Sequence, residues 1–196
     1  MAHYFQTPDS AVELRTIRAT IWGEEFEFTT ANGVFSATRL DLGTSVLLRE
    51  VPPPVHAGRV LDLGCGFGPI GVSIAKHCPT TFVDAVDVND RALELTRMNA
   101  RRHGVADRVN AGRPEGFATA VYDEIWSNPP IRIGKAALHE MLATWIPRLT
   151  RDGVAWLVVG KNLGSDSLQR WLNDQGFNTV KHASAKGFRV LKLTLN

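Results

Sequence analysis

The chain has 196 residues, of which 44% are hydrophobic and 21% are charged, and its formal net charge at pH 7 is +2. These values are ordinary for a globular protein, and they exclude a disordered chain, a collagen-like repeat and a bundle of membrane helices. The positive charge is concentrated in residues 113–196, which carry 11 basic and 7 acidic side chains. We therefore expect a polyanionic partner, if there is one, to contact the C-terminal half.

The N-terminal region, residues 1–51, is expected to form a β-hairpin followed by a lead-in segment. Apolar and polar residues alternate over residues 14–21, Trp22-Gly23-Glu24 is typical of a turn, and Phe26 and Phe28 alternate on a return strand. A short helix is predicted over residues 44–50. The three consecutive prolines at positions 52–54 end that helix and mark a boundary.

Strands and helices alternate from residue 52 to residue 196, which we expect to form the main domain. The predicted strands are residues 59–63, 81–88, 108–111, 122–126, 154–159, 178–183 and 188–194, and the predicted helices are residues 69–77, 91–103, 135–149 and 165–175. This alternation predicts an α/β fold with a seven-stranded, mostly parallel sheet and helices on both faces. The last strand should be antiparallel, because no helix precedes it.

A glycine-rich segment, residues 60–68 with the sequence Val-Leu-Asp-Leu-Gly-Cys-Gly-Phe-Gly, follows the first of these strands. Glycines between a strand and a helix let the backbone come close to a ligand. Asp87 ends the next strand, at the distance where a ribose-binding carboxylate belongs. Asp62 would repel a phosphate but suits a cationic ammonium group. The pattern therefore predicts an adenine nucleoside cofactor that carries positive charge.

A second motif, Ser127-Asn128-Pro129-Pro130, comes directly after the fourth strand. The Asn128 side chain and the Pro129 carbonyl could accept the two N–H hydrogens of a planar amino or amide nitrogen. Such a nitrogen is a poor nucleophile because its lone pair is delocalised, so fixing it in place is the main task of a catalyst. Replacement of Asn128 by Asp, which keeps an acceptor, is expected to retain more activity than replacement by Ala.

The two motifs resemble those of a known family. Leu-Asp-Leu-Gly-Cys-Gly is similar to the first motif of class I S-adenosylmethionine-dependent methyltransferases, and Asn-Pro-Pro is similar to the motif of those that modify planar nitrogens. The lead-in segments at residues 33–36 and 41–44, with Leu47 and Leu48 and the stretch 186–190, resemble the small-subunit ribosomal RNA guanine-N2 methyltransferases.

The resemblance implies a Rossmann-like methyltransferase sheet, S-adenosylmethionine as cofactor, and methyl transfer to an exocyclic amino nitrogen of RNA, guanine N2 of small-subunit ribosomal RNA above all. The residues expected at the cofactor are Asp62, Gly64, Cys65, Gly66, Gly68, Asp87, Val88, Arg113 and Asn128. Asn128 and Pro129 are the expected catalytic residues, and the expected substrate-binding residues are Pro130, Ile131, Arg132 and Lys135. Ile131 stands where the family has a stacking aromatic residue, so Arg132 is a candidate to stack instead.

Other features bear on partners and location. The six histidines have no ligand spacing, so we expect no metal site. No signal sequence or membrane span is evident, and Cys65 and Cys78 are expected to be reduced thiols in a cytoplasmic protein. Of the five tryptophans, Trp126 is expected near the site. Relatives of the guanine-N2 group often carry a second, degenerate domain copy; with one copy here, we expect a monomer or homodimer that selects RNA by other means.

Two alternative functions stay open from the sequence. A protein glutamine-amide methyltransferase would use the same Asn-Pro-Pro chemistry, although the lead-in segment and the basic C-terminal half favour RNA. A non-catalytic RNA-binding or ribosome assembly factor could keep the same fold. The presence of Asp62, Gly64, Gly66, Asp87 and Asn128 argues against such a loss of activity.

Overall fold

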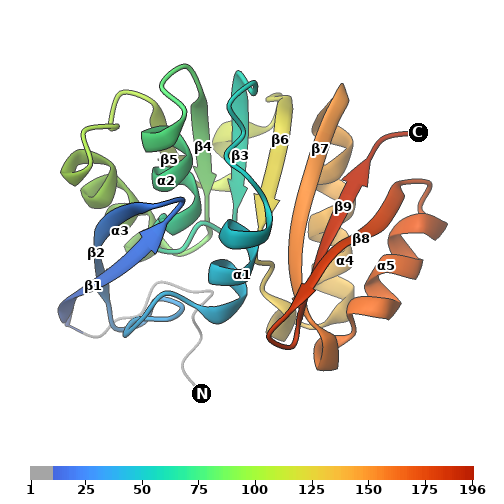
Figure 1. The fold of residues 1–196 in the computed structure, drawn as a ribbon, viewed down its shortest axis with the longest axis horizontal. Helices are drawn as coiled ribbons and strands as arrows, with labels where there is room; N and C mark the ends of the chain where they lie inside the picture. The colour runs from blue at the N-terminus through green and yellow to red at the C-terminus, as the bar shows by residue number, and fades with distance from the viewer. Residues whose placement is uncertain (1–10) are drawn as a thin grey trace.

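A seven-stranded sheet runs through the centre of the structure, a computed structural model that describes residues 11–196 (Figure 1). The first ten residues, on which the expectation of no signal sequence depends, lie outside the described part. The strand order is β5-β4-β3-β6-β7-β9-β8. The strands are β3 (Arg59–Leu63), β4 (Phe82–Val86), β5 (Val109–Gly112), β6 (Tyr122–Ser127), β7 (Leu149–Gly160), β8 (Asn178–Ala185) and β9 (Phe188–Thr194).

The sheet has the predicted α/β topology. Strands β3 to β7 pair in parallel, whereas the last strand, β9, is antiparallel to both of its neighbours, β7 and β8. The helices are α1 (Leu42–Glu50), α2 (Pro69–His77), α3 (Asp90–Arg102), α4 (Lys135–Trp145) and α5 (Ser165–Asp174). The chain runs outward from β3 to β5 and then returns to β6, so the direction of winding reverses between β3 and β6.

Both faces of the sheet are covered by apolar cores. Consecutive residues of a strand point to opposite sides, so neighbouring apolar residues enter different cores. On β3, Val60 belongs to the core formed with the hairpin, α1, α2 and α3, whereas Leu61 belongs to the core formed with α4 and α5. Both side chains are fully buried. The near-continuous apolar strands of the sequence are thus explained by burial on two sides.

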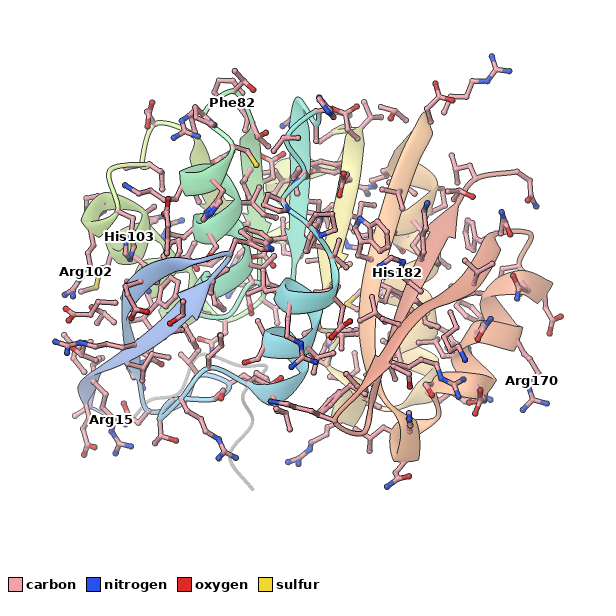
Figure 2. All side chains as sticks on the ribbon, in the orientation of Figure 1. Arg15, Phe82, Arg102, His103, Arg170 and His182 are labelled. Carbon is pink, nitrogen blue, oxygen red and sulfur yellow. The ribbon has the colours of Figure 1, made fainter. Side chains whose placement is uncertain are left out.

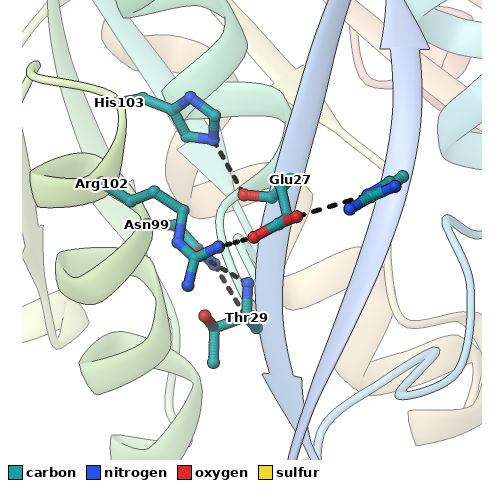
Figure 3. A network of polar contacts seen from close by, with 6 residues as sticks. Glu27, Thr29, Asn99, Arg102 and His103 are labelled. Carbon is teal, nitrogen blue, oxygen red and sulfur yellow. Dashed lines mark hydrogen bonds and ion pairs between the residues drawn. The ribbon is translucent and has the colours of Figure 1, made fainter.

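The N-terminal hairpin, β1 (Leu14–Ile21) and β2 (Glu24–Ala31), packs on α3 (Figure 3). The Thr29 N–H donates to Asn99 Oδ1 at 2.7 Å, and Asn99 Nδ2 donates back to the Thr29 carbonyl at 2.8 Å. Glu27 forms an ion pair with Arg102, and its carbonyl lies 3.0 Å from Nε2 of His103. The hairpin thereby fixes where the lead-in segment enters the sheet region.

Several element boundaries differ from the sequence prediction. The helix expected over residues 135–149 ends at Trp145, and β7 begins at Leu149 rather than at residue 154. Pro147 explains the early end, because it has no N–H to donate and its ring clashes with the carbonyl four residues earlier in a helix. Helix α1 begins two residues earlier than predicted, since Asp41 caps it by accepting the Thr44 N–H at 3.0 Å.

Candidate active site

A cavity of about 470 Å³ opens at the carboxyl ends of β3, β4 and β6, where the winding reverses. This is the position at which open α/β sheets bind ligands. Its walls come from the lead-in segment, the glycine loop, the ends of β4 and β6, part of α4, and the first residue of β9. Residues far apart in the sequence therefore meet at one edge of the sheet, the lower edge in Figure 1.

The glycine loop between β3 and α2 lines one side of the cavity. Gly64 and Gly66 have φ of 76° and 58°, a left-handed backbone that favours glycine. A Cβ added to Gly66 would meet no atom within 4 Å, so this backbone borders open space. The Gly66 N–H donates to Asp87 Oδ2 at 2.9 Å, which ties the loop to the end of β4.

Asp87 directly follows β4 and is half-buried. It accepts the N–H of Gly66 through one oxygen and the N–H of Asn89, at 2.9 Å, through the other. Burial raises the pKa of this carboxyl, while the hydrogen bonds from Asn89 and Gly66 oppose that rise. Each carboxylate oxygen keeps a second lone pair, so the group can accept further hydrogen bonds from a ligand in the cavity.

Asp62 lies beneath the glycine loop and is fully buried. Its Oδ2 accepts the Gly71 N–H at 2.8 Å, but its Oδ1 has no hydrogen-bond partner among the described residues. Burial raises the pKa of this carboxyl to about 7, and the nearby Asp87 charge adds to the rise. A cation bound over the loop would therefore be favoured, because it stabilises the ionised form of Asp62.

Asn128 follows β6 directly and has a fixed orientation. Its Nδ2 donates to Asp41 Oδ2 at 2.7 Å and to Thr44 Oγ1 at 3.1 Å. The amide nitrogen must face Asp41, because a carboxylate accepts hydrogen bonds and cannot donate them. The amide oxygen, Oδ1, takes no hydrogen bond from any residue that the structure describes, and Asn128 lines the cavity. The side chain thus offers an acceptor.

The two prolines after Asn128 form a tight turn. The Ile131 N–H donates to the Pro129 carbonyl at 2.8 Å, and Pro130 has φ of −75° and ψ of 76°, the geometry of an inverse γ-turn. One lone pair of the Pro129 carbonyl is therefore used inside the turn, and the other is left for a ligand. The second predicted acceptor is thus present, but it is shared.

Comparison with known proteins identifies the family. The sequence model of one protein family, the methyltransferase small domain, matches residues 25–192. The chain belongs to this family. Its predicted likeness to class I S-adenosylmethionine-dependent methyltransferases is confirmed, and so is the Rossmann-like fold.

Individual relatives match the chain over different lengths. The uncharacterised protein YbxB of Bacillus subtilis is 30% identical over 97% of this chain and 96% of its own length. Ribosomal RNA small subunit methyltransferase C of Acinetobacter baumannii is 37% identical over 76% of this chain and 46% of its own length. A T. thermophilus 16S rRNA N2 methyltransferase, solved with AdoMet and guanosine, superposes with a TM-score of 0.81 at 23% identity, over 96% of this chain and 52% of that chain. This methyltransferase domain therefore spans about half the length of those ribosomal RNA methyltransferases.

Most residues predicted from the sequence line the methyltransferase cavity. Those that line it are Gly64, Cys65, Gly66, Asp87, Val88, Asn128, Pro129, Pro130, Ile131 and Arg132. Four do not. Asp62 lies below the loop, and Gly68 begins α2 with a left-handed backbone against Thr96. Arg113 pairs with Asp90 through two contacts of 2.9 Å, and exposed Lys135 begins α4 outside the lining.

The expectation for Trp126 is wrong. Its side chain is fully buried, packs on Trp22 and Trp156, and donates to Glu124 at 2.8 Å. The tryptophan that lines the cavity is Trp145, at the end of α4. Trp126 and Asn128 are close in sequence, but the strand directs Trp126 into the core formed with the hairpin, α1, α2 and α3.

Several cavity residues were not expected there. Asp41 and Thr44 reach Asn128 from the start of α1, and two aromatic rings, Phe35 and Phe188, line the same cavity. The lead-in motif was visible in the sequence, but nothing in it indicates contact with a residue more than 80 positions away. Within residues 11–196, no cluster of three His, Cys, Asp or Glu side chains could hold a metal ion, and no helix is long and apolar enough to cross a membrane.

Proposed function

We propose that this protein transfers the methyl group of S-adenosylmethionine to an exocyclic amino nitrogen of RNA, namely guanine N2 of small-subunit ribosomal RNA, in the cytoplasm. The observation that carries the proposal is the fixed orientation of Asn128. Its Nδ2 is held by Asp41 and Thr44, which leaves Oδ1 as the acceptor in the cavity. An acceptor without a neighbouring strong base suits a nitrogen that must be oriented rather than deprotonated.

The residues around the glycine loop fit the cofactor. S-adenosylmethionine supplies a methyl group on a positively charged sulfonium, together with an ammonium, a ribose and an adenine. Asp87 has lone pairs for ribose hydroxyls, and the open backbone at Gly66 admits close approach. The buried Asp62 carboxyl, whose Oδ1 has no described partner, would be favoured in its ionised form when a cation binds over the loop. We assign the cofactor to this side of the cavity.

The other side of the cavity fits a flat heterocycle with an amino group. Asn128 Oδ1 and the remaining lone pair of the Pro129 carbonyl would accept the two N–H hydrogens. Their direction would hold the nitrogen with its lone pair toward the methyl group. Ile131, Phe35 and Phe188 supply apolar faces for the ring. The two phenylalanines take the part of the aromatic residue that is absent at position 131.

Relatives support RNA as the substrate. Several chains named ribosomal RNA small subunit methyltransferase C share 30–41% identity with this one, and the solved T. thermophilus relative acts on N2 of 16S rRNA according to its description. Charge also supports an RNA partner. Arg132 lines the cavity and Lys135 begins α4 three residues further along, and neither forms an ion pair with a described residue. Cations of this kind suit phosphate contacts.

The decisive experiment follows a labelled methyl group. Purified protein with tritiated S-adenosylmethionine is offered small ribosomal subunits, protein-free small-subunit RNA, and a protein bearing an exposed glutamine amide. We expect label in RNA, at one guanine after mapping. A short RNA with that guanine replaced by inosine, which lacks only the N2 amino group, should take up none. Label in the protein instead would establish the glutamine-amide alternative, and no transfer despite cofactor binding would favour an assembly factor.

A further inference from the structure

We propose that Asp41, together with Thr44, is the positioning residue that sets the amide of Asn128 in its catalytic orientation. The inference rests on the proposed function, since it concerns the acceptor used for amino-group methylation. It assigns to the lead-in segment a direct part in the chemistry, although that segment lies 87 positions before Asn128 in the sequence. Asp41 does not touch the transferred methyl group; it acts through Asn128.

Two hydrogen bonds from the start of α1 hold the amide of Asn128. Asp41 Oδ2 and Thr44 Oγ1 lie 2.7 Å and 3.1 Å from Asn128 Nδ2, so both hydrogens of the amide nitrogen are engaged. Thr44 is buried, and Asp41 is half-buried at the edge of the cavity. Hydrogen bonds to a carboxylate are stronger than those between neutral groups, and they gain strength away from water.

The opposite orientation of the Asn128 amide is unfavourable. An amide is nearly symmetric in shape, so Asn128 could turn by 180° with little change in packing. In that orientation Oδ1 would face the Asp41 carboxylate, and Nδ2 would present hydrogens to the N–H groups of the substrate. Both contacts would be repulsive. Asp41 therefore excludes the inactive orientation before the substrate arrives, which is preorganisation of the kind that lowers a barrier.

Capping alone does not account for the choice of Asp41. The same Oδ2 that accepts the Thr44 N–H, at 3.0 Å, also accepts from Asn128. Ser caps a helix about as well as Asp, but its side chain is shorter by one carbon. Asp41→Ser should thus keep the cap of α1 and lose the contact with Asn128, whereas Asp41→Asn keeps an oxygen able to serve both.

The first arm compares these two variants. We expect Asp41→Ser to lower the single-turnover methylation rate about 10- to 100-fold, the value of one hydrogen bond to a charged group. Cofactor affinity by calorimetry and the melting temperature should stay near those of the wild type. Asp41→Asn should recover most of the rate. Equal rates for wild type and Asp41→Ser would overturn the proposal.

The second arm uses Thr44. Thr44→Val removes the hydroxyl at constant shape and should slow methylation several-fold, and Thr44→Ser should restore it. Ser45→Ala is the matched control, because the Ser45 hydroxyl donates to the Asp41 carbonyl at 2.9 Å on the same turn without reaching Asn128. It weakens the same helix end and should leave the rate unchanged.

The third arm tests direct contact between positions 41 and 128. Asn128→Asp places two carboxylates at hydrogen-bond distance, so the structure reverses the expectation that this variant outperforms Asn128→Ala. We expect Asn128→Asp to be the less active of the two. Adding Asp41→Asn should raise its rate at least 10-fold by removing the like charge. Absence of rescue would contradict the contact.

One readout does not depend on the substrate. In the wild type, the two Nδ2 protons of Asn128, assigned by their absence in Asn128→Ala, should give separate, exchange-protected NMR signals. In Asp41→Ser they should lose protection. If the wild type methylates no RNA, the proposed function fails while this readout still decides the positioning of Asn128. Protection retained in Asp41→Ser would overturn the positioning whatever the substrate is.

Discussion

At the scale of single residues, the candidate site is built from acceptors. Asn128 Oδ1, the Pro129 carbonyl and the Asp87 carboxylate all point to a ligand that donates hydrogen bonds, as a ribose and an amino group do. Among residues 11–196, no lysine or histidine lines the cavity, so none of these side chains competes for those acceptors. The chemistry that this arrangement favours is orientation of a weak nucleophile, in which the proton leaves after the methyl group has been transferred.

Asn128→Ala tests this view directly. Loss of one of two preorganised acceptors should lower turnover by about 10²–10³, by analogy with removal of one oxyanion-hole donor. The dissociation constant of S-adenosylmethionine should change little, because the lost interaction acts on the transition state. Single-turnover methylation and calorimetry on the same preparation give both quantities. A wild-type rate in this variant would reduce the Asn-Pro-Pro segment to a rigid turn.

Asp62 predicts a dependence of stability on pH. Its pKa of about 7 in the folded protein exceeds the ordinary value of 3.8, so the folded state holds a proton that the unfolded chain releases. The stabilisation is fully present below about pH 4 and is lost as pH rises toward 7. Asp62→Asn cannot titrate, and its free energy of unfolding relative to wild type should rise by on the order of 2–3 kcal/mol from pH 5 to pH 8.

Urea unfolding of both proteins without cofactor, at pH 5 and pH 8, measures this difference. Asp84→Asn serves as a control, because Asp84 is also buried on the sheet but pairs with Arg59 at 2.7 Å. Parallel pH profiles for wild type and Asp62→Asn would show that Asp62 titrates as an ordinary carboxyl.

At the scale of elements, α1 links the lead-in segment to the Asn-Pro-Pro segment through its contacts with Asn128. Its first turn carries Asp41 and Thr44, and its body packs on β7 and β9. Gly43 lies at the centre of this junction: an added Cβ would stand 2.9 Å from Phe188 Cε1 and 3.0 Å from Asp41 Oδ2. A glycine in a helix costs about 1 kcal/mol relative to alanine. Here the missing side chain gives the carboxylate its room.

Gly43→Ala should therefore damage activity more than stability. The added methyl group must displace Asp41 or the Phe188 ring, so we expect the methylation rate to fall about 10-fold or more. The gain in helix propensity partly offsets the overpacking, so unfolding should change by only about 1–2 kcal/mol. Gly116→Ala, at a position where an added Cβ meets nothing within 4 Å, is the control. Equal methylation by Gly43→Ala and wild type would refute this reading of the junction.

At the scale of the whole molecule, the sequence predicts features that are encoded in short segments, but it does not predict contacts between distant segments. The alternation of strands and helices, the glycine loop and Asp87 are encoded within short segments, and they were predicted from those segments. The contact of Asp41 with Asn128 depends on how the hairpin and α1 dock on the sheet, which no local pattern specifies. Trp126 shows the same limit, because its proximity in sequence to Asn128 gave no information on whether its side chain reaches the cavity or is enclosed by the core.

Charge on the whole molecule bears on how RNA would bind. Figure 2 shows Arg15 on the hairpin and Arg170 on α5 projecting outward at opposite ends, so exposed cations are not confined to the cavity. Several other arginines are engaged within the protein, including Arg113 with Asp90 and Arg189 with Asp166. Arg132 at the cavity and Lys135 at the start of α4 are therefore the cations best placed to contact phosphates beside a bound base.

The salt dependence of RNA binding tests this placement. Each phosphate contact releases counterions, so the logarithm of the binding constant falls with the logarithm of salt concentration by about 0.7–0.9 per contact. Neutralising Arg132 and Lys135 to Gln should reduce the slope by about 1.4–1.8 and leave cofactor affinity unchanged. Neutralising Arg170 and Lys181, which lie on α5 and β8 away from the cavity lining, removes the same charge and should barely change the slope. Equal effects of the two pairs would mean that net charge, rather than a track beside the cavity, governs binding.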